Sequence, residues 1–248
     1  MHQTWYLGAV YFFLHFQYNG WFSFTILGLL FEKLQEVKIP VSKLKRIFWL
    51  FAMACGPAYF LSALWMPMPG FVYLLVVLSA IVQFTAWMWA ITLIYKERIA
   101  IKQKIPDLAF ITLQLSLIAM TIKLFLQLGS TIPKLSNLAF GFRPIVIGYL
   151  HLVLLGFTSL FILGYAMYSG VMASGNRSRA GIIIFISGII LNEMALMVQG
   201  VTAMGYIVVP YINEFLVLIS LIMFTGLLVL NIPFWGKKKK AYQFTLPQ

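Results

Sequence analysis

Seven long apolar segments recur along the chain, and each is long enough to cross a lipid bilayer. They cover residues 5–31, 47–66, 71–95, 106–128, 144–169, 180–206 and 212–235. A membrane helix needs about 20 apolar residues to cross about 30 Å of hydrocarbon. Because lipid offers the backbone no hydrogen-bond partners, each segment must be helical, and the alternating ten-residue segments of a barrel are missing. The sequence predicts one all-α domain, a polytopic transmembrane bundle of seven helices.

The composition excludes an ordinary water-soluble domain. Hydrophobic residues make up 62% of the 248 positions and charged residues 10%, whereas about 25% of the residues of a soluble domain are charged. The net charge of +12 would suggest nucleic acid in a soluble protein. Here the basic residues lie at the ends of the segments, where they contact anionic lipid and report orientation. We expect the lipid bilayer, and no nucleic acid, as a partner.

Basic residues gather in every second connection. Fifteen follow segments one, three and five or lie in the tail, and the alternate connections hold two, Lys134 and Arg143. Cytoplasmic loops carry the excess of Lys and Arg. This distribution predicts an N-terminus outside, a C-terminus inside and a basic cytoplasmic tail at 236–248. The turn at 66–70 is short enough to make segments two and three antiparallel neighbours, and the connection at 129–143 is long enough to form a lid.

Four ionisable residues fall inside the apolar segments: His15, Lys123, His151 and Glu193. Such residues cost several kcal/mol unless they are paired or hydrated, and each is therefore a hypothesis for a functional site. From the helical rise, their depths below the outer face are about 15 Å for His15, 8 Å for Lys123, 10 Å for His151 and 20 Å for Glu193. Three of the four share the outer half, as one polar site would require.

The first segment carries a polar stripe. Tyr11, His15, Tyr18 and Asn19 recur at helical spacing, so they lie on one face, which must meet protein or a cavity. Neutral imidazole is the commonest metal ligand, and its second nitrogen needs a partner that Tyr18 or Asn19 can supply.

His151 lies at a similar depth on segment five, with Gly148 one turn outward. Two histidines from different helices are what six-coordinate haem requires.

Plainer interpretations stay open for each of these residues. Membrane histidines often form only interhelical hydrogen bonds, and Lys123 is near enough to its helix end to extend toward the interface. Glu193 stays protonated, pairs with Lys123, or relays protons. Gln83 and Gln114 are expected to form interhelical hydrogen bonds.

The run at 14–22, Leu-His-Phe-Gln-Tyr-Asn-Gly-Trp-Phe, resembles a segment of uncharacterised bacterial multi-pass membrane proteins. Those proteins are distantly similar to the catalytic subunits of haem-copper oxidases and nitric-oxide reductases. The resemblance implies the bacterial cytoplasmic (inner) membrane, a shortened member of the family, and a ligand role for His15 alone. The double-histidine and His-x-His patterns of oxidase subunits are missing here, so oxygen reduction is not predicted.

Three functions follow as hypotheses. The first is a haem- or metal-binding, redox-associated protein in which His15 and His151 are ligands, Tyr11, Tyr18 and Asn19 surround the cofactor, and Glu193 and Lys123 handle protons or ions. The second is a cofactor-free transporter or proton-handling bundle. The third is an assembly subunit held by other membrane subunits. Whether the protein is an enzyme is left open.

Overall fold

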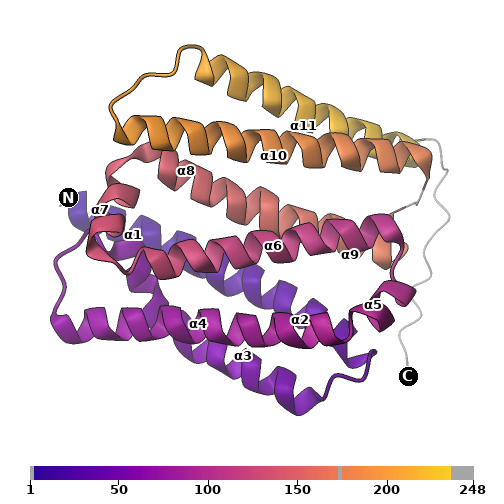
Figure 1. Ribbon diagram of the computed structural model, residues 1–248, viewed down its shortest axis with the longest axis horizontal. Helices are drawn as coiled ribbons and strands as arrows, with labels where there is room; N and C mark the ends of the chain where they lie inside the picture. The colour runs from indigo at the N-terminus through magenta and orange to yellow at the C-terminus, as the bar shows by residue number, and fades with distance from the viewer. Residues whose placement is uncertain (1–2, 173–174, 236–248) are drawn as a thin grey trace.

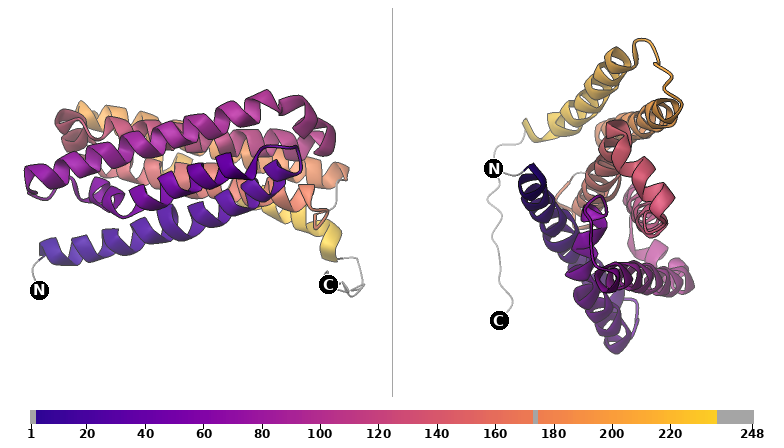
Figure 2. Two further views of the ribbon diagram at one scale, coloured as in Figure 1. Left: turned by 90° about the horizontal axis from the view of Figure 1, so that it is seen from below. Right: turned by 90° about the vertical axis from the view of Figure 1, so that its left-hand side faces the viewer.

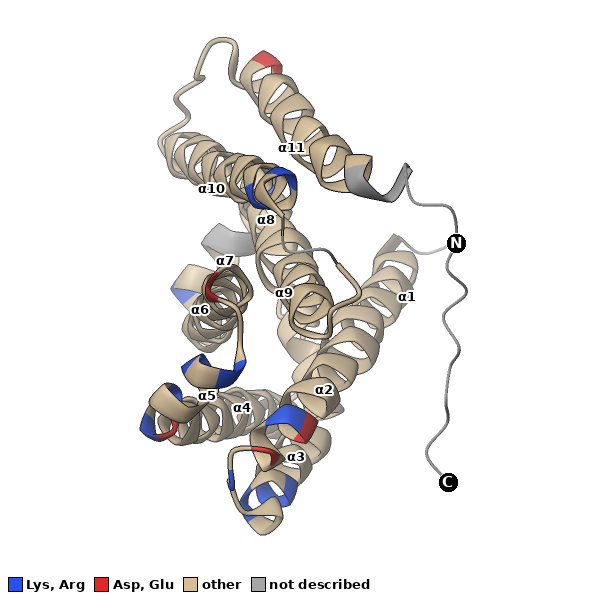
Figure 3. Ribbon diagram, turned by 90° about the vertical axis from the view of Figure 1, so that its right-hand side faces the viewer, with Lys and Arg blue, Asp and Glu red and all other residues tan. Residues whose placement is uncertain are grey.

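The computed structural model describes residues 3–172 and 175–235, and within these ranges the regular elements are helices, with no strand. Most of the long helices lie roughly along one axis (Figures 1 and 2). The basic residues gather at one end, here called the basic end (Figure 3), where α2, α5 and α9 finish and α3 and α10 begin. The all-α fold is confirmed.

The first segment is one uninterrupted helix made of α1 (Gln3–His15), the π-helical η1 (Phe16–Phe22) and α2 (Ser23–Gln35). The fifth segment is built in the same way. The remaining elements follow in chain order: α3 (Val41–Cys55), the 3₁₀-helical η2 (Pro57–Ala63), α4 (Gly70–Lys96), α5 (Arg98–Lys104), α6 (Asp107–Gly129), α7 (Pro133–Gly141), α8 (Arg143–His151), the π-helical η3 (Leu152–Ser159), α9 (Leu160–Tyr168), α10 (Asn176–Met204) and α11 (Ile212–Trp235).

Among the described residues, five helices are long and apolar enough to cross a membrane, and a sixth span results if the bent pair Val41–Cys55 and Pro57–Ala63 is counted as one. The protein is therefore a multi-pass integral membrane protein. The helix at 3–35 is not among these spans, and its middle carries the polar residues His15, Gln17 and Asn19. Seven spans and the orientation of the termini stay predictions.

The helices pack in a definite neighbour order. α6 packs against α4 on one side and against η3 and α9 on the other, α8 packs against α10, and α10 packs against α11. Seen from the basic end, α11 lies at one edge of the molecule and α3 at another (Figure 3). The prediction that segments two and three are antiparallel neighbours is confirmed, because α4 packs against both α3 and η2. The largest completely buried side chains of the main core are Trp87, Phe157 and Phe161.

The second predicted span differs from the expected straight helix at 47–66. It begins already at Val41, and it bends by 50° after Cys55. Pro57, which has no backbone N–H, starts the 3₁₀ segment. The N–H of Tyr59 then donates to the carbonyl of Gly56 at 3.1 Å. In a regular α-helix it would donate to Cys55, so the Cys55 carbonyl becomes available to another group.

Candidate ligand cavity

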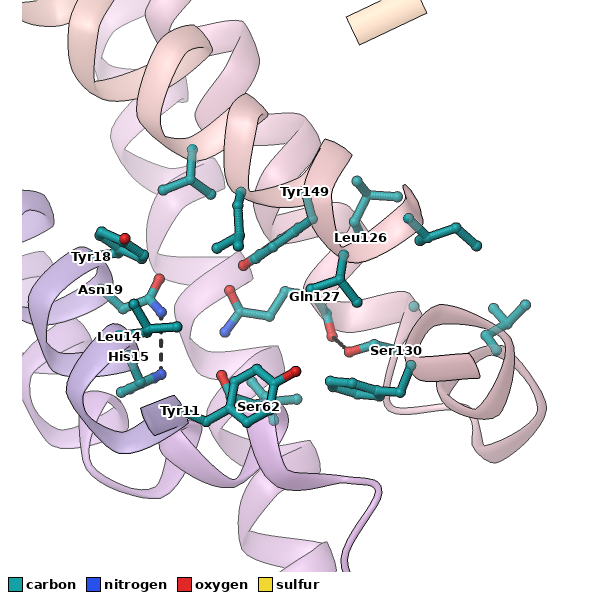
Figure 4. Close-up of a pocket in the computed structure, with 18 of the residues that line it drawn as sticks. Tyr11, Leu14, His15, Tyr18, Asn19, Ser62, Leu126, Gln127, Ser130 and Tyr149 are labelled. Atoms are coloured by element: carbon teal, nitrogen blue, oxygen red, sulfur yellow. Dashed lines mark hydrogen bonds between the residues drawn. The ribbon is translucent and has the colours of Figure 1, made fainter. Parts of the chain in front are cut away.

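A cavity of about 360 Å³ lies toward the end opposite the basic end, between the first helix, η2, the end of α6, α7 and α8. This volume falls within the range typical of small-molecule sites, about 300 to 1,000 Å³. Figure 4 shows side chains from these elements pointing into the same space. Its polar lining consists of Tyr11, His15, Tyr18, Asn19, Ser62, Gln127, Ser130 and Tyr149.

The predicted polar stripe of the first helix faces this cavity. Tyr11, His15, Tyr18 and Asn19 all line it, although the π-helical turn after His15 changes the spacing on which the stripe was predicted. The hydroxyl of Ser23 donates to the carbonyl of Tyr18 at 2.7 Å, and this bond spans the wide turn. Single π-helical turns within α-helices are frequent at functional sites.

His15 is 2% exposed, and both of its ring nitrogens are hydrogen bonded. Its Nε2 donates to the carbonyl of Cys55 at 3.0 Å, the carbonyl that the bend after α3 makes available. The Nδ2 of Asn19 donates to Nδ1 of His15 at 3.2 Å. Because a neutral imidazole has one donor and one acceptor, the pair of bonds uses its whole capacity. This arrangement matches the interpretation of His15 as an interhelical hydrogen-bonding residue.

His151 does not line the cavity with His15, although its neighbours Tyr149, Leu150 and Val153 do. It is half-buried, and its Nδ1 donates to the carbonyl of Ile147, one turn earlier in the same helix, at 2.8 Å. The described part of the chain contains no cluster of three or more His, Cys, Asp and Glu side chains that could hold a metal ion. Ligation of haem or metal by the two histidines stays a prediction.

Lys123 is buried within the protein, only 2% exposed, one helical turn from Gln127 on α6. It lies close enough to His15 and Cys55 for its charge to act on both, and Cys55 is itself buried. The two ion pairs of the described residues both involve Lys33. Of the three interpretations of Glu193, the ion pair with Lys123 is therefore not formed: Glu193 lies half-buried on α10, and its Oε1 is 3.5 Å from Nδ2 of Asn192.

Two residues that line the cavity each have a side-chain carbonyl oxygen without a hydrogen-bond partner among the described residues. These oxygens are Oδ1 of Asn19 and Oε1 of Gln127, and both are buried. Gln127, 7% exposed, donates from Nε2 to Oε1 of Gln83 at 3.2 Å, which confirms Gln83 as an interhelical hydrogen-bonding residue. A buried acceptor left unpaired costs about 1 to 3 kcal/mol. Both oxygens belong to residues that line the same cavity.

Sequence reasoning missed Gln127 and Tyr149 as site residues. The available signal was weak, since Gln127 lies one turn from Lys123 and near the end of an apolar segment. The connection at 129–143, which the sequence makes long enough for a lid, forms α7, and Leu135 and Phe140 of α7 line the cavity. Its role as a lid stays a prediction.

Comparison with known protein families finds no family model that matches the chain, and comparison with curated proteins finds no match. The resemblance of the run at 14–22 to bacterial multi-pass proteins therefore stays an expectation.

Proposed function

We propose that this integral membrane protein binds a small, largely apolar molecule through a hydrogen-bond donor in the cavity beside the first helix. The observation that carries the proposal is the pair of buried, unpartnered carbonyl oxygens on Asn19 and Gln127. An amide oxygen accepts hydrogen bonds and does not donate them. The complementary ligand group is therefore a hydroxyl, phenol or N–H.

The rest of the lining supports an apolar ligand body. Most of the cavity wall is hydrocarbon and aromatic, including Leu14, Leu61, Phe125 and Leu150. Small-molecule sites typically combine such walls with a few convergent polar groups that set the orientation of the ligand. The tyrosine hydroxyls of Tyr11, Tyr18 and Tyr149 supply donors for a second polar group on the same ligand.

The haem- or metal-binding hypothesis fits this geometry less well. Ligation by His15 would require one of its two hydrogen bonds to break, either to Cys55 or to Asn19. Transport or proton handling, assembly with other membrane subunits, and residence in the bacterial inner membrane remain predictions. None of them accounts for both unpartnered oxygens.

A matched pair of probes tests the proposal. para-Hexylphenol carries a donor, and para-hexylanisole has the same ring and chain with that donor methylated. Binding to the detergent-purified protein is measured by equilibrium dialysis against empty micelles. We expect the wild type to bind the phenol about tenfold more tightly than the ether, because only the phenol satisfies a buried acceptor.

Gln127→Leu should lower this preference several-fold, because it removes one of the two acceptors. Gln199→Leu is the matched control, since Gln199 pairs with Asn213 between α10 and α11 and does not line the cavity. Equal affinities for the two probes in the wild type would mean that no acceptor is available to a ligand, and the proposal would fail. No saturable binding of either probe would reject the cavity itself.

A further inference from the structure

A second hollow, of about 460 Å³, lies at the basic end between α5 and the first half of α6. We call it the α5–α6 groove. It is lined by Arg98, Ile99, Lys102, Gln103, Phe110 and Gln114. It therefore combines two cations with apolar side chains, at the level where a membrane helix meets the lipid headgroups.

The cations of the groove are available to an anion. Arg98 and Lys102 are one helical turn apart on α5 and are exposed. The guanidinium of Arg98 donates to the carbonyl of Tyr95 at 3.0 Å and lies over the Tyr95 ring, which leaves most of its five donors unused. Glu97 is the sole acid in the sequence between 96 and 104, and the ion pairs of the described residues do not include it.

Gln114 is the group that most needs an outside partner. It lies two helical turns into α6 from Asp107, about 10 Å deeper into the membrane. Its side chain is exposed, and none of the hydrogen bonds among the described residues includes it. It was expected to bond a neighbouring helix, as Gln83 does. An amide that faces hydrocarbon without a partner costs several kcal/mol.

We propose that the α5–α6 groove binds an anionic phospholipid from the leaflet at the basic end. The phosphate accepts hydrogen bonds from Arg98 and Lys102, and the amide of Gln114 donates to an ester carbonyl below the headgroup. The first part of an acyl chain lies against Ile99 and Phe110. Basic pockets between membrane helices are known sites for anionic headgroups. The site is separate from the cavity beside the first helix and does not depend on the function proposed for it.

The test compares two lipids with the same acyl chains, one with an anionic and one with a zwitterionic headgroup. The purified protein is titrated with phosphatidylglycerol or phosphatidylcholine of identical chains, and bound lipid is counted by native mass spectrometry. We expect the wild type to retain one phosphatidylglycerol with an affinity at least tenfold above that for phosphatidylcholine. The double variant Arg98→Gln, Lys102→Gln should lose most of this preference, because each basic residue near a membrane surface contributes about fivefold.

Two further variants separate a groove from diffuse surface charge. Lys43→Gln with Lys45→Gln removes two exposed charges from α3 at the same end and should leave the preference unchanged. Gln114→Leu should weaken both lipids alike by a few-fold, because an ester is common to both. An equal loss of preference in the α3 variant would overturn the proposal. Displacement of the lipid by millimolar inorganic phosphate would also overturn it, since that result assigns the groove to free phosphate.

Discussion

Two regions of this molecule are packed in opposite ways. Between α10 and α11 the backbones approach so closely that a Cβ on Gly226 would lie 2.7 Å from the backbone nitrogen of Phe185, and one on Gly181 would lie 2.8 Å from the carbonyl oxygen of Gly226. Around the first helix, α6 and α8 the helices do not approach in this way: a cavity remains, with a mostly apolar wall and several polar side chains.

The contact between α10 and α11 is packed for stability, whereas the region around the cavity is not. Lipid tails are as apolar as leucine, so membrane helices gain stability from close packing of small residues and from interhelical hydrogen bonds. The contact between α10 and α11 is stabilised by the close packing of small residues. The region around the cavity contains two unpaired acceptors and a buried lysine. These groups lower the stability of the folded state, and a region packed only for stability would not contain them.

Gly226→Leu should have the largest effect, because the new side chain meets backbone atoms that have no room to move. We expect a loss of about 3 kcal/mol in the free energy of unfolding, the upper end for overpacking, measured by denaturation in mixed micelles. Gly28→Leu is the matched control, since a Cβ at Gly28 meets nothing within 4 Å. Equal losses in the two variants would remove the contrast between the two regions.

His15→Ala should cost less, about 1 to 2 kcal/mol, because it removes one interhelical hydrogen bond and leaves the Cys55 carbonyl unpaired. His151→Ala should cost less still, since His151 bonds a carbonyl of its own helix. The same denaturation assay ranks the two variants. The reverse order would show that the bond at the bend after α3 does not support the fold.

Optical spectra of the wild type and of the same two histidine variants test the haem hypothesis. The haem hypothesis predicts a Soret band in the oxidised and reduced wild type that is lost in both His15→Ala and His151→Ala. The protein is expressed in a haem-competent host, so that haem is available to it. A colourless wild type without metal by elemental analysis rejects that hypothesis and leaves the binding proposal unaffected.

The smallest effect is expected at the basic end. The Lys33 ammonium, 2.9 Å away, and then the Tyr168 hydroxyl hold the pKa of the Glu36 carboxyl below its usual value of about 4.5. A lowered pKa stabilises the folded state above the unfolded value, and this contribution is lost as the pH falls below about 4.5 through the folded value. Thermal unfolding at pH 6 and pH 3.5 should therefore differ slightly less in Glu36→Gln than in the wild type. An identical pH response would show that these exposed contacts contribute nothing, as many do.

Much of the architecture was predictable from the sequence because the bilayer imposes it. The apolar runs at 71–95 and 212–235 became α4 and α11 almost residue for residue, since a helix is the structure that satisfies the backbone in lipid. The stripe of Tyr11, His15 and Asn19 likewise had to face protein or a cavity.

The hydrogen-bond partners of those polar side chains were decided by the tertiary structure alone. The bend at Pro57 made the carbonyl of Cys55 available to His15, while His151 was left bonding its own helix. The packing of α6 buried Lys123 without an ion pair to Glu193, and it paired Gln127 with Gln83 while Gln114 stayed exposed. The physical reason is the same in each case: hydropathy sets which residues enter the membrane, whereas a hydrogen-bond partner depends on which neighbouring helix presents a free donor or acceptor within about 3 Å.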